Sequence, residues 1–204
     1  MFVEKMMERE RSMSINDLQI KPLTPDMANQ FTSYLSEMDY SHAEHWHFCY
    51  CQYYHLDCSS AEWRERSADQ NKALAETNIK SGLMHGLVAF DGDQMVGWVN
   101  VNDVNNYAQL KNDEELHSLT GRNAIVVCFV IHPDYRGKGL ATRMLAEAIE
   151  ESRRQGFDKI IGKPFIWSAH PQRQYLGVPK MYEDLGFHKV SEANGVNTYI
   201  LELK

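Results

Sequence analysis

One stretch, AIVVCFVIHPDYRGKGLATRMLAEAI at residues 124–149, constrains the fold of this chain more than any other. It begins as an apolar run suited to a buried strand, turns at 132–134 and continues after two glycines as an amphipathic helix. Gly137 and Gly139 permit backbone angles that other residues avoid and let a ligand approach the main chain closely. The unpaired N–H groups and partial positive charge at a helix N-terminus bind anions. The stretch therefore predicts a phosphate-binding strand, turn and helix.

Composition and charge exclude several classes of protein. The chain has 204 residues, of which 43% are hydrophobic and 24% are charged, so we expect a flexible N-terminal extension over 1–14 and a single domain over 15–204. A net charge of −7 argues against nucleic-acid binding, which needs a basic face. The sequence contains neither an apolar run of ~20 residues nor a signal peptide, so we expect a cytoplasmic protein without membrane contact. The oligomeric state stays open, and a homodimer is one alternative.

Hydrophobic periodicity predicts strands and helices in mixed order. Strands are expected at 18–23, 86–90, 94–101, 125–131 and 159–166 and in a final hairpin over 186–203, and helices at 25–38, 59–79, 140–155 and 179–185. The polar stretch 102–122 reads as a long loop or a short helix. A strand–helix–strand crossover within 125–166 predicts a parallel, right-handed connection. Together these elements predict an α/β (α+β) fold with one central mixed sheet of about six to seven strands flanked by helices.

Three segments resemble the GNAT superfamily of acetyl-CoA-dependent N-acetyltransferases. They are VGW at 96–98, VIHPDYRGKGLA at 130–141 and MYEDLGF at 181–187. The middle segment matches the family pattern of Arg or Gln, two residues, Gly, one residue and Gly or Ala through Arg136, Gly139 and Ala141. The resemblance covers 18–204 and implies a GNAT-like fold, N-acetyltransferase activity and acetyl-CoA as cosubstrate.

The resemblance also implies which residues hold the cofactor. Backbone groups of Phe129 and Ile131 are expected to pair with the pantetheine arm, as an added strand would. The expected pyrophosphate-binding loop consists of Arg136, Gly137, Lys138, Gly139, Leu140 and Ala141. The cationic side chains in this loop, with Arg143 beyond it, would strengthen phosphate binding. The alternative is a plain strand-to-helix turn with basic residues on its surface.

Acetyl transfer requires acid–base groups as well as a cofactor site. The departing thiolate benefits from a general acid, and a tyrosine, with an ordinary pKa of about 10, suits that role. The resemblance implies that Tyr182 is this acid, and the alternative is an aromatic residue packed between helix and sheet. Many family members carry an asparagine shortly before this tyrosine. Here residues 177–179 are Gly-Val-Pro, and we expect the helix to begin anew at this point. We therefore assign the role of that asparagine to no residue of this chain.

The base that removes the proton from the acceptor amine stays open. The candidates are Glu44, Asp57, Asp103, Glu114, His42, His45 and His47. Histidine, with an ordinary pKa near ~6.5, can relay a proton at neutral pH. Ordered water is the alternative to any of these side chains.

The segment 39–58, DYSHAEHWHFCYCQYYHLDC, is too apolar for a linker and has no clear period. In the GNAT arrangement, the segment between the first two helices overhangs the acceptor. The expected acceptor-binding residues are Glu44, Trp46, Tyr50, Tyr53 and Tyr54, with Phe48 as a further wall residue. Aromatic faces attract a cation, which suits an amine of a small molecule or peptide. The alternative is that most of these rings belong to the core.

The same segment raises two other functions. Cys49, Cys51 and Cys58 stand among four histidines, and both residue types are zinc ligands. The Cys-x-Cys spacing is awkward for one tetrahedral site, so we expect no metal. The leading hypothesis is direct acetyl transfer to a primary amine in a ternary complex. The alternatives are a non-catalytic acetyl-CoA-binding sensor or interaction module, a metal or redox sensor on the same fold, and a ping-pong enzyme with a nucleophilic cysteine.

Overall fold

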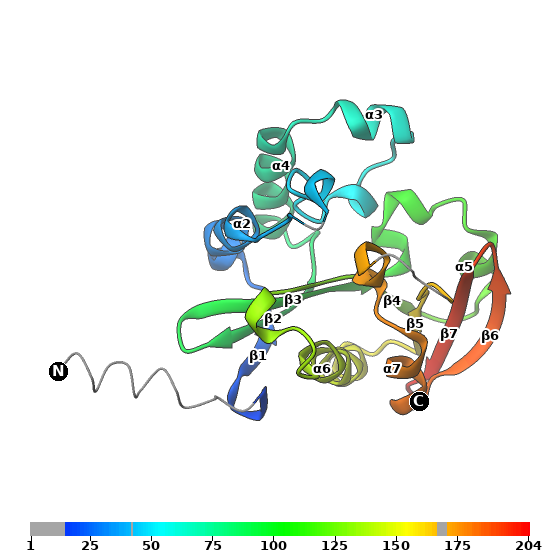
Figure 1. Ribbon diagram of the computed structural model, residues 1–204. Coiled ribbons are helices and arrows are strands. Elements are labelled where there is room, and N and C mark those ends of the chain that lie inside the picture. Colours follow the sequence, from blue (N-terminus) through cyan, green and yellow to red (C-terminus); the bar gives the residue numbers. More distant parts are fainter. Residues whose placement is uncertain (1–14, 42, 167–170) are drawn as a thin grey trace.

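The computed structural model describes residues 15–41, 43–166 and 171–204, and the extension predicted over 1–14 lies outside them. Its centre is a seven-stranded sheet in the order β1-β2-β3-β4-β5-β7-β6 (Figure 1). The strands are β1 Gln19–Pro22, β2 Gly86–Asp91, β3 Gln94–Asp103, β4 Asn123–Ile131, β5 Lys159–Gly162, β6 His188–Ala193 and β7 Val196–Glu202. Only the β4–β5 pair is parallel in this sheet, as the predicted crossover requires. The single mixed sheet flanked by helices is therefore confirmed.

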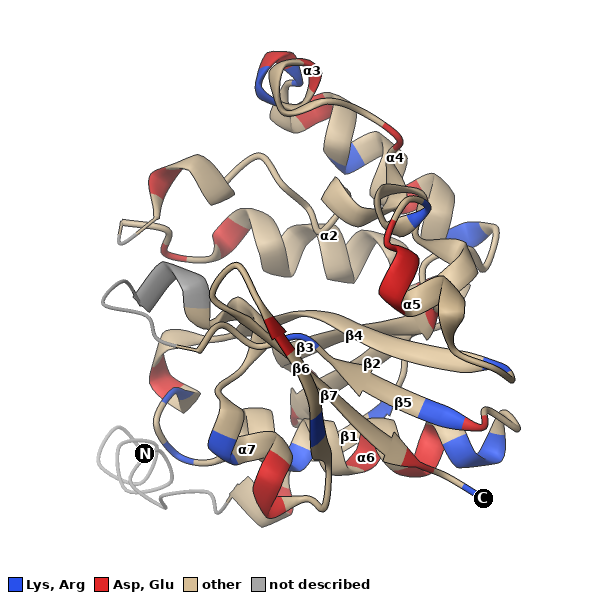
Figure 2. Ribbon diagram, turned by 90° about the vertical axis from the view of Figure 1, so that its right-hand side faces the viewer, with Lys and Arg blue, Asp and Glu red and all other residues tan. Residues whose placement is uncertain are grey.

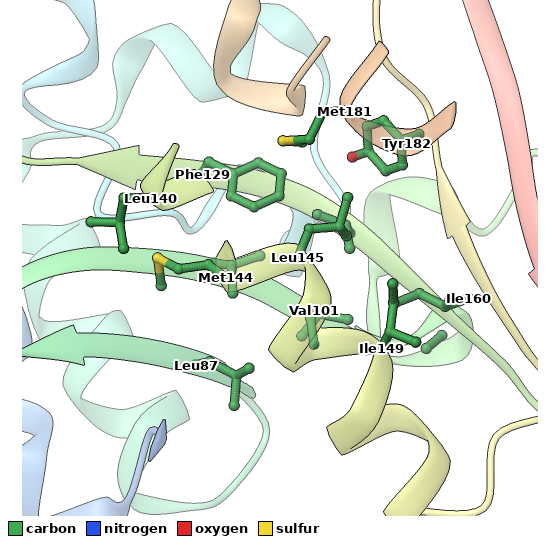
Figure 3. Packing of buried hydrophobic residues seen from close by; sticks show 14 of the residues in the cluster. Leu87, Val101, Phe129, Leu140, Met144, Leu145, Ile149, Ile160, Met181 and Tyr182 are labelled. Atoms are coloured by element: carbon green, nitrogen blue, oxygen red, sulfur yellow. The ribbon is translucent and has the colours of Figure 1, made fainter. Parts of the chain in front are cut away.

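Helices cover both faces of the sheet. They are α2 Ala28–Glu37, α3 Ser60–Glu65, α4 Ala68–Lys80, α5 Glu114–Ser118, α6 Leu140–Arg154 and α7 Pro179–Asp184. Figure 1 shows α2 and α4 on one face and α6 and α7 on the other. On the first face, the rings of Phe31 and Trp98 pack edge to face with centroids 4.9 Å apart. On the second face, Met144 and Leu145 of α6 pack with Tyr182 of α7 (Figure 3). No helix of the described residues is long and apolar enough to cross a membrane.

In the part of the chain that the structure describes, eight short 3-10 turns accompany these elements. They are η1 Ile15–Asp17, η2 Pro25–Met27, η3 Glu44–Trp46, η4 Tyr53–His55, η5 Val104–Asn106, η6 Ala108–Leu110, η7 Pro133–Tyr135 and η8 Pro171–Leu176. The polar stretch 102–122, predicted as a loop or a short helix, contains η5, η6 and the short helix α5. The first predicted helix begins as η2, with Pro25 in its first turn, and continues as α2.

The helix predicted over 59–79 is wrong in one respect, because the chain forms two helices there. Arg66 takes an extended conformation with ψ 141°, which ends α3. Ser67 then caps α4 by a reciprocal capping box with Gln70. Its side chain accepts a hydrogen bond from the Gln70 N–H, so two otherwise unpaired amides are satisfied at the new helix start. The Ser-x-x-Gln spacing was the available sequence signal for this break.

The fifth strand is also shorter than the predicted 159–166. The β4–β5 ladder ends at the pair Val126 and Gly162, after which the two chains separate. Beyond this point the chain follows β7 instead, and the Asn197 N–H donates to the Pro164 carbonyl over 3.0 Å. The last five residues of β4, 127–131, thus extend beyond the β5 ladder. Parallel strands that diverge in this way leave one edge of β4 open to a ligand that binds like a strand.

An irregularity in β4 decides which of its side chains face which helices. The β3–β4 register shifts between Asn100 and Val101, so Val127 has no partner in the ladder. Simple alternation would put Cys128 on the same face as Val126. Instead Val126 packs with the α6 core, whereas Cys128 packs with the core beneath α2. The bulge therefore turns Cys128 toward the side of the sheet on which the segment 39–58 lies.

Candidate functional site

A cavity of about 890 Å³ lies between the loop that precedes α6, the open end of β4 and the segment 39–58. This volume falls in the range of sites that enclose a small molecule or cofactor. Four parts of the chain contribute to its wall: the donor loop at 135–142, the end of β4, the segment 39–58 with α3, and the chain from Gln174 to Met181. The predicted phosphate loop and the predicted acceptor segment thus face one shared cavity.

The N-terminus of α6 is built to leave its amides free. Gly137 and Gly139 have φ angles of 69° and 89°, which residues with a side chain rarely adopt. A Cβ at either position would meet no atom within 4 Å, so both glycines border open space. Gly139 is the N-cap and provides no side-chain cap, and the first intrahelical bond runs from the Arg143 N–H to the Gly139 carbonyl. The amides of the first turn therefore remain available to an anion.

The end of β4 presents backbone groups to the same cavity. The His132 N–H donates to the Val96 carbonyl of β3 over 2.9 Å. Because backbone groups alternate between the two edges of a strand, those of Ile131 and Phe129 face away from β3. The Ile131 carbonyl accepts a hydrogen bond from Arg136 Nε over 2.8 Å. This edge is thus accessible to hydrogen-bond donors from outside the sheet, as a strand-like ligand requires.

Most residues of the predicted cofactor site lie on the cavity wall. Those on the wall are Phe129, Ile131, Arg136, Gly137, Gly139, Leu140 and Ala141. Lys138 does not line the cavity, and its ammonium lies 5.9 Å from the centre of the Tyr135 ring. The Arg143 guanidinium is held elsewhere by the carbonyls of Ile15 and Leu18. Of the three cations expected at this helix start, only Arg136 therefore faces the cavity.

The aromatic wall is larger than the sequence indicated. Trp46, Phe48, Tyr50, Tyr53 and Tyr54 all line the cavity as expected, whereas Glu44 does not. The wall also contains Tyr40, Trp63 and Tyr175, which sequence reasoning missed. The sequence predicts one continuous helix around Trp63 and no helix or strand around Tyr175. No local sequence pattern indicates that either residue lies near the segment 39–58.

Contacts between these rings, together with a hydrogen bond from α4, fix the positions of the wall residues. Trp46 packs edge to face on Tyr175 with centroids 5.5 Å apart, and Tyr53 does so on Trp63 at 5.3 Å. The Asn71 side-chain amide of α4 donates to the Phe48 carbonyl over 2.8 Å. This amide satisfies a backbone group inside a loop that has little regular hydrogen bonding of its own. The aromatic side of the cavity is thus a shaped surface supported by a helix.

Comparison with known proteins identifies the family. A family model described as "Acetyltransferase (GNAT) family" matches residues 40–187, which is most of the chain and includes the cavity wall from Tyr40 to Met181. The chain belongs to the GNAT acetyltransferase family. It is accordingly an acyltransferase. None of the curated proteins compared with the chain matches it.

Solved structures share the fold of this GNAT chain at low sequence identity. A mosquito arylalkylamine N-acetyltransferase like 5b is 15% identical, with a TM-score of 0.57, over 92% of this chain and 100% of its own. A Drosophila melanogaster polyamine N-acetyltransferase is 15% identical, with a TM-score of 0.55, over the same 92% and 100%. The protein yncA of Salmonella typhimurium, solved with acetyl-CoA, is 16% identical, with a TM-score of 0.52, over 92% and 94%.

The expected acid of this GNAT chain, Tyr182, lies next to the cavity. The Tyr182 hydroxyl donates to the Leu176 carbonyl over 2.8 Å, and the side chain is fully buried. Burial raises the pKa of Tyr182 above its ordinary value, so the hydroxyl keeps its proton. Figure 3 shows the hydroxyl pointing toward the side on which Phe129 and Met181 lie. Both neighbours line the cavity although Tyr182 itself does not.

The expected bases are distributed unevenly around the GNAT site. Of those in the described residues, only His45 lines the cavity, while His42 lies outside the described residues. Asp57 forms an ion pair with Lys111, and Asp103 forms one with Arg122. Neither carboxylate faces the cavity, nor does Glu44 or Glu114. Among the described candidates, the geometry thus leaves the imidazole of His45.

The cysteines of the GNAT chain occupy different positions relative to the cavity. Cys51 Sγ lies 3.9 Å from Cys128 Sγ on β4, and both line the cavity with Cys49, whereas Cys58 does not. The hydrogen bond to Cys128 and burial raise the pKa of the Cys51 thiol, and burial raises that of Cys49 to about 12. Few thiolates exist at neutral pH under these conditions, so both are poor nucleophiles. Among the described residues, no three His, Cys, Asp or Glu side chains could share a metal ion.

Proposed function

We propose that this protein transfers an acetyl group from acetyl-CoA to the primary amine of a small molecule or peptide by direct transfer in a ternary complex. One observation carries the proposal. A single cavity is bounded on one side by the donor loop and the open edge of β4, and on the other by an aromatic wall. Donor and acceptor can therefore occupy it together, with the thioester next to the amine.

The donor side fits acetyl-CoA group by group. The backbone of Phe129 and Ile131 would hold the pantetheine arm, and the amides from Gly137 to Ala141 would bind the pyrophosphate. The Arg136 guanidinium would then leave the Ile131 carbonyl to contact a phosphate. Support comes from the acetyl-CoA that the Salmonella protein of the same fold contains.

The chemistry assigned to the chain follows from these positions. Acetyl-CoA supplies a thioester whose carbonyl carbon accepts the amine nitrogen. His45, or water next to it, takes a proton from the amine. The Tyr182 hydroxyl gives its proton to the departing sulfur, and the reaction ends with an N-acetyl amine and free coenzyme A. The raised pKa values of Cys49 and Cys51 favour direct transfer over an acetyl-cysteine route.

The test is release of coenzyme A with a panel of amines, combined with initial-rate analysis. We expect release that depends on both acetyl-CoA and an amine, with intersecting double-reciprocal plots. Parallel plots would contradict the ternary complex. Tight acetyl-CoA binding without release by any amine would support the alternative of a non-catalytic sensor. Structural neighbours include enzymes named for arylalkylamines and for polyamines, so the fold alone leaves the acceptor open.

A further inference from the structure

We infer that the acceptor of this enzyme is a compact primary amine carried on an aromatic body, with no second cationic centre. The inference rests on the proposed function and narrows its substrate class. It excludes polyamines, aminoglycosides and basic peptides as preferred acceptors. Two independent properties of the cavity carry it, namely its aromatic lining and the sign of its charges.

The acceptor side presents ring faces from three separate segments of the chain, namely 39–58, α3 and η8. Phe48 stacks at a tilt on Trp63 with centroids 5.2 Å apart, and Tyr53 packs edge to face on the same Trp63 at 5.3 Å. In another part of the wall, Tyr175 packs edge to face against Trp46. Rings in this arrangement offer edges and faces to an aromatic guest, which prefers offset or edge-to-face contact over open solvent.

The hydroxyl groups of two wall tyrosines are bound to protein groups, which leaves the apolar ring surfaces for the ligand. The Tyr50 hydroxyl shares a 2.8 Å hydrogen bond with Ser36 Oγ, and the Tyr53 hydroxyl donates to the side-chain oxygen of Gln109 over 3.0 Å. An acceptor with several hydroxyl or ammonium groups would therefore find few free partners on this wall. A flat, apolar acceptor loses little by entering it.

The charged side chains on the described cavity wall are all positive. Of the described residues on the wall, none is Asp or Glu, and the permanently charged side chains are Arg64 and Arg136. Figure 2 shows β4, which ends at the cavity, free of charged residues along its length. The carboxylates of the described residues thus lie outside the cavity wall.

A cationic centre on the aromatic side of the cavity has no carboxylate of the described wall residues as counter-ion, and the Arg64 guanidinium lies on the same wall, whereas Arg136 would contact a cofactor phosphate. Ring faces compensate for the ammonium of a single amine, and desolvation lowers its pKa toward the neutral form that attacks the thioester. A second ammonium would face desolvation without that chemical benefit. A diamine or polyamine should therefore bind worse than an aromatic monoamine of similar size, despite the acidic surface of the protein.

The first experiment compares 2-phenylethylamine and tryptamine with agmatine, spermidine and kanamycin on the intact protein. Binding is measured by calorimetry with coenzyme A present, and turnover by coenzyme A release. We expect the two aromatic amines to bind at least tenfold more tightly and to show at least tenfold higher kcat/KM. Equal or better binding of spermidine or kanamycin would overturn the inference. Preferential aromatic binding without turnover would instead contradict the proposed function and leave the inference standing.

The second experiment changes the sign of charge on the wall. Arg64 is exposed on α3, so Arg64→Glu and Arg64→Gln should both fold, which thermal unfolding checks. Arg64→Glu should raise kcat/KM for spermidine at least fivefold relative to Arg64→Gln, while the two variants differ less than twofold with 2-phenylethylamine. A second pair of variants, Trp63→Glu and Trp63→Gln, is compared in the same way with spermidine and 2-phenylethylamine, at a less exposed position of the wall. No difference between the members of either pair with spermidine would refute the charge argument.

Discussion

The Tyr182 hydroxyl and the Leu176 carbonyl share a 2.8 Å hydrogen bond that connects α7 to the η8 turn before it. The bond points the hydroxyl toward the cavity side of α7, where Phe129 and Met181 lie (Figure 3). Burial raises the pKa of Tyr182, so the group remains an acid at neutral pH. To protonate the leaving sulfur, the hydroxyl must break its hydrogen bond to the Leu176 carbonyl and form one to the sulfur.

Tyr182→Phe should therefore lower kcat by roughly 10²-fold, within the range for a general acid, and leave the Kd for acetyl-CoA within about twofold. Loss of the bond to the buried Leu176 carbonyl should cost about 1–2 kcal/mol in the free energy of unfolding. Steady-state rates, calorimetry and denaturant unfolding measure the three quantities. Tyr199→Phe is the matched control, because Tyr199 stacks on Tyr182 at 5.9 Å but its hydroxyl donates to Glu183. Equal kcat in wild type and Tyr182→Phe would remove Tyr182 from the reaction.

Gly139→Asp should weaken acetyl-CoA binding by at least roughly 10²-fold, because it sets a carboxylate at the N-cap of α6 where the pyrophosphate would sit. Combination with Arg136→Ala should abolish detectable binding. Gly195→Asp is the control, since Gly195 has a φ of 77°, similar open space at its Cβ and a place in the β6–β7 turn. Both aspartates should cost similar stability, about 1–2 kcal/mol for the left-handed backbone. If Gly139→Asp binds acetyl-CoA normally by calorimetry, the donor loop is wrongly assigned.

No covalent acetyl-enzyme should form when acetyl-CoA is supplied without an amine. The pKa of Cys49 is raised to about 12, and that of Cys51 is raised by its hydrogen bond with Cys128, so thiolates are scarce at neutral pH. Intact-mass spectrometry should show unmodified protein, and iodoacetamide should modify these thiols at least roughly 10-fold more slowly than a free cysteine. Detection of an acetyl group on any of these cysteines would revive the ping-pong route.

Stability should fall on acidification because of His55. Both ring nitrogens of His55 are buried without a hydrogen-bond partner in the described structure, and burial lowers its pKa to about 4. Between the ordinary value of about 6.5 and pH 4, the unfolded chain binds a proton that the folded chain does not, so stability decreases with falling pH. The loss should approach about 3 kcal/mol at pH 4.5, at 1.36 kcal/mol for each pH unit. Urea unfolding of wild type and His55→Phe from pH 7.5 to 4.5 should diverge by that amount. Parallel stability curves would show that His55 titrates normally.

Much of the fold could be predicted because its signals are local. The apolar run and the helical period within 124–149 correspond to β4 and α6, and the strands predicted at 86–90 and 94–101 correspond to the β2–β3 hairpin. The exceptions are places where two local signals compete. The apolar stretch after Gly162 favours a longer strand, yet the chain turns toward β7. The helical pattern through Arg66 hides the stronger cap at Ser67.

The sequence by itself predicted the anion-binding start of α6, and only the tertiary structure brought together the aromatic wall of the cavity. A glycine-containing helix start binds an anion through backbone groups of consecutive residues, so its chemistry is readable along the chain. The aromatic wall joins Trp46 of η3, Trp63 of α3 and Tyr175 of η8, which come together only in the folded chain. The β4 bulge likewise sets Cys128 beside Cys51 against the simple alternation of the strand. Contacts of this kind depend on packing between distant segments, which local periodicity does not record.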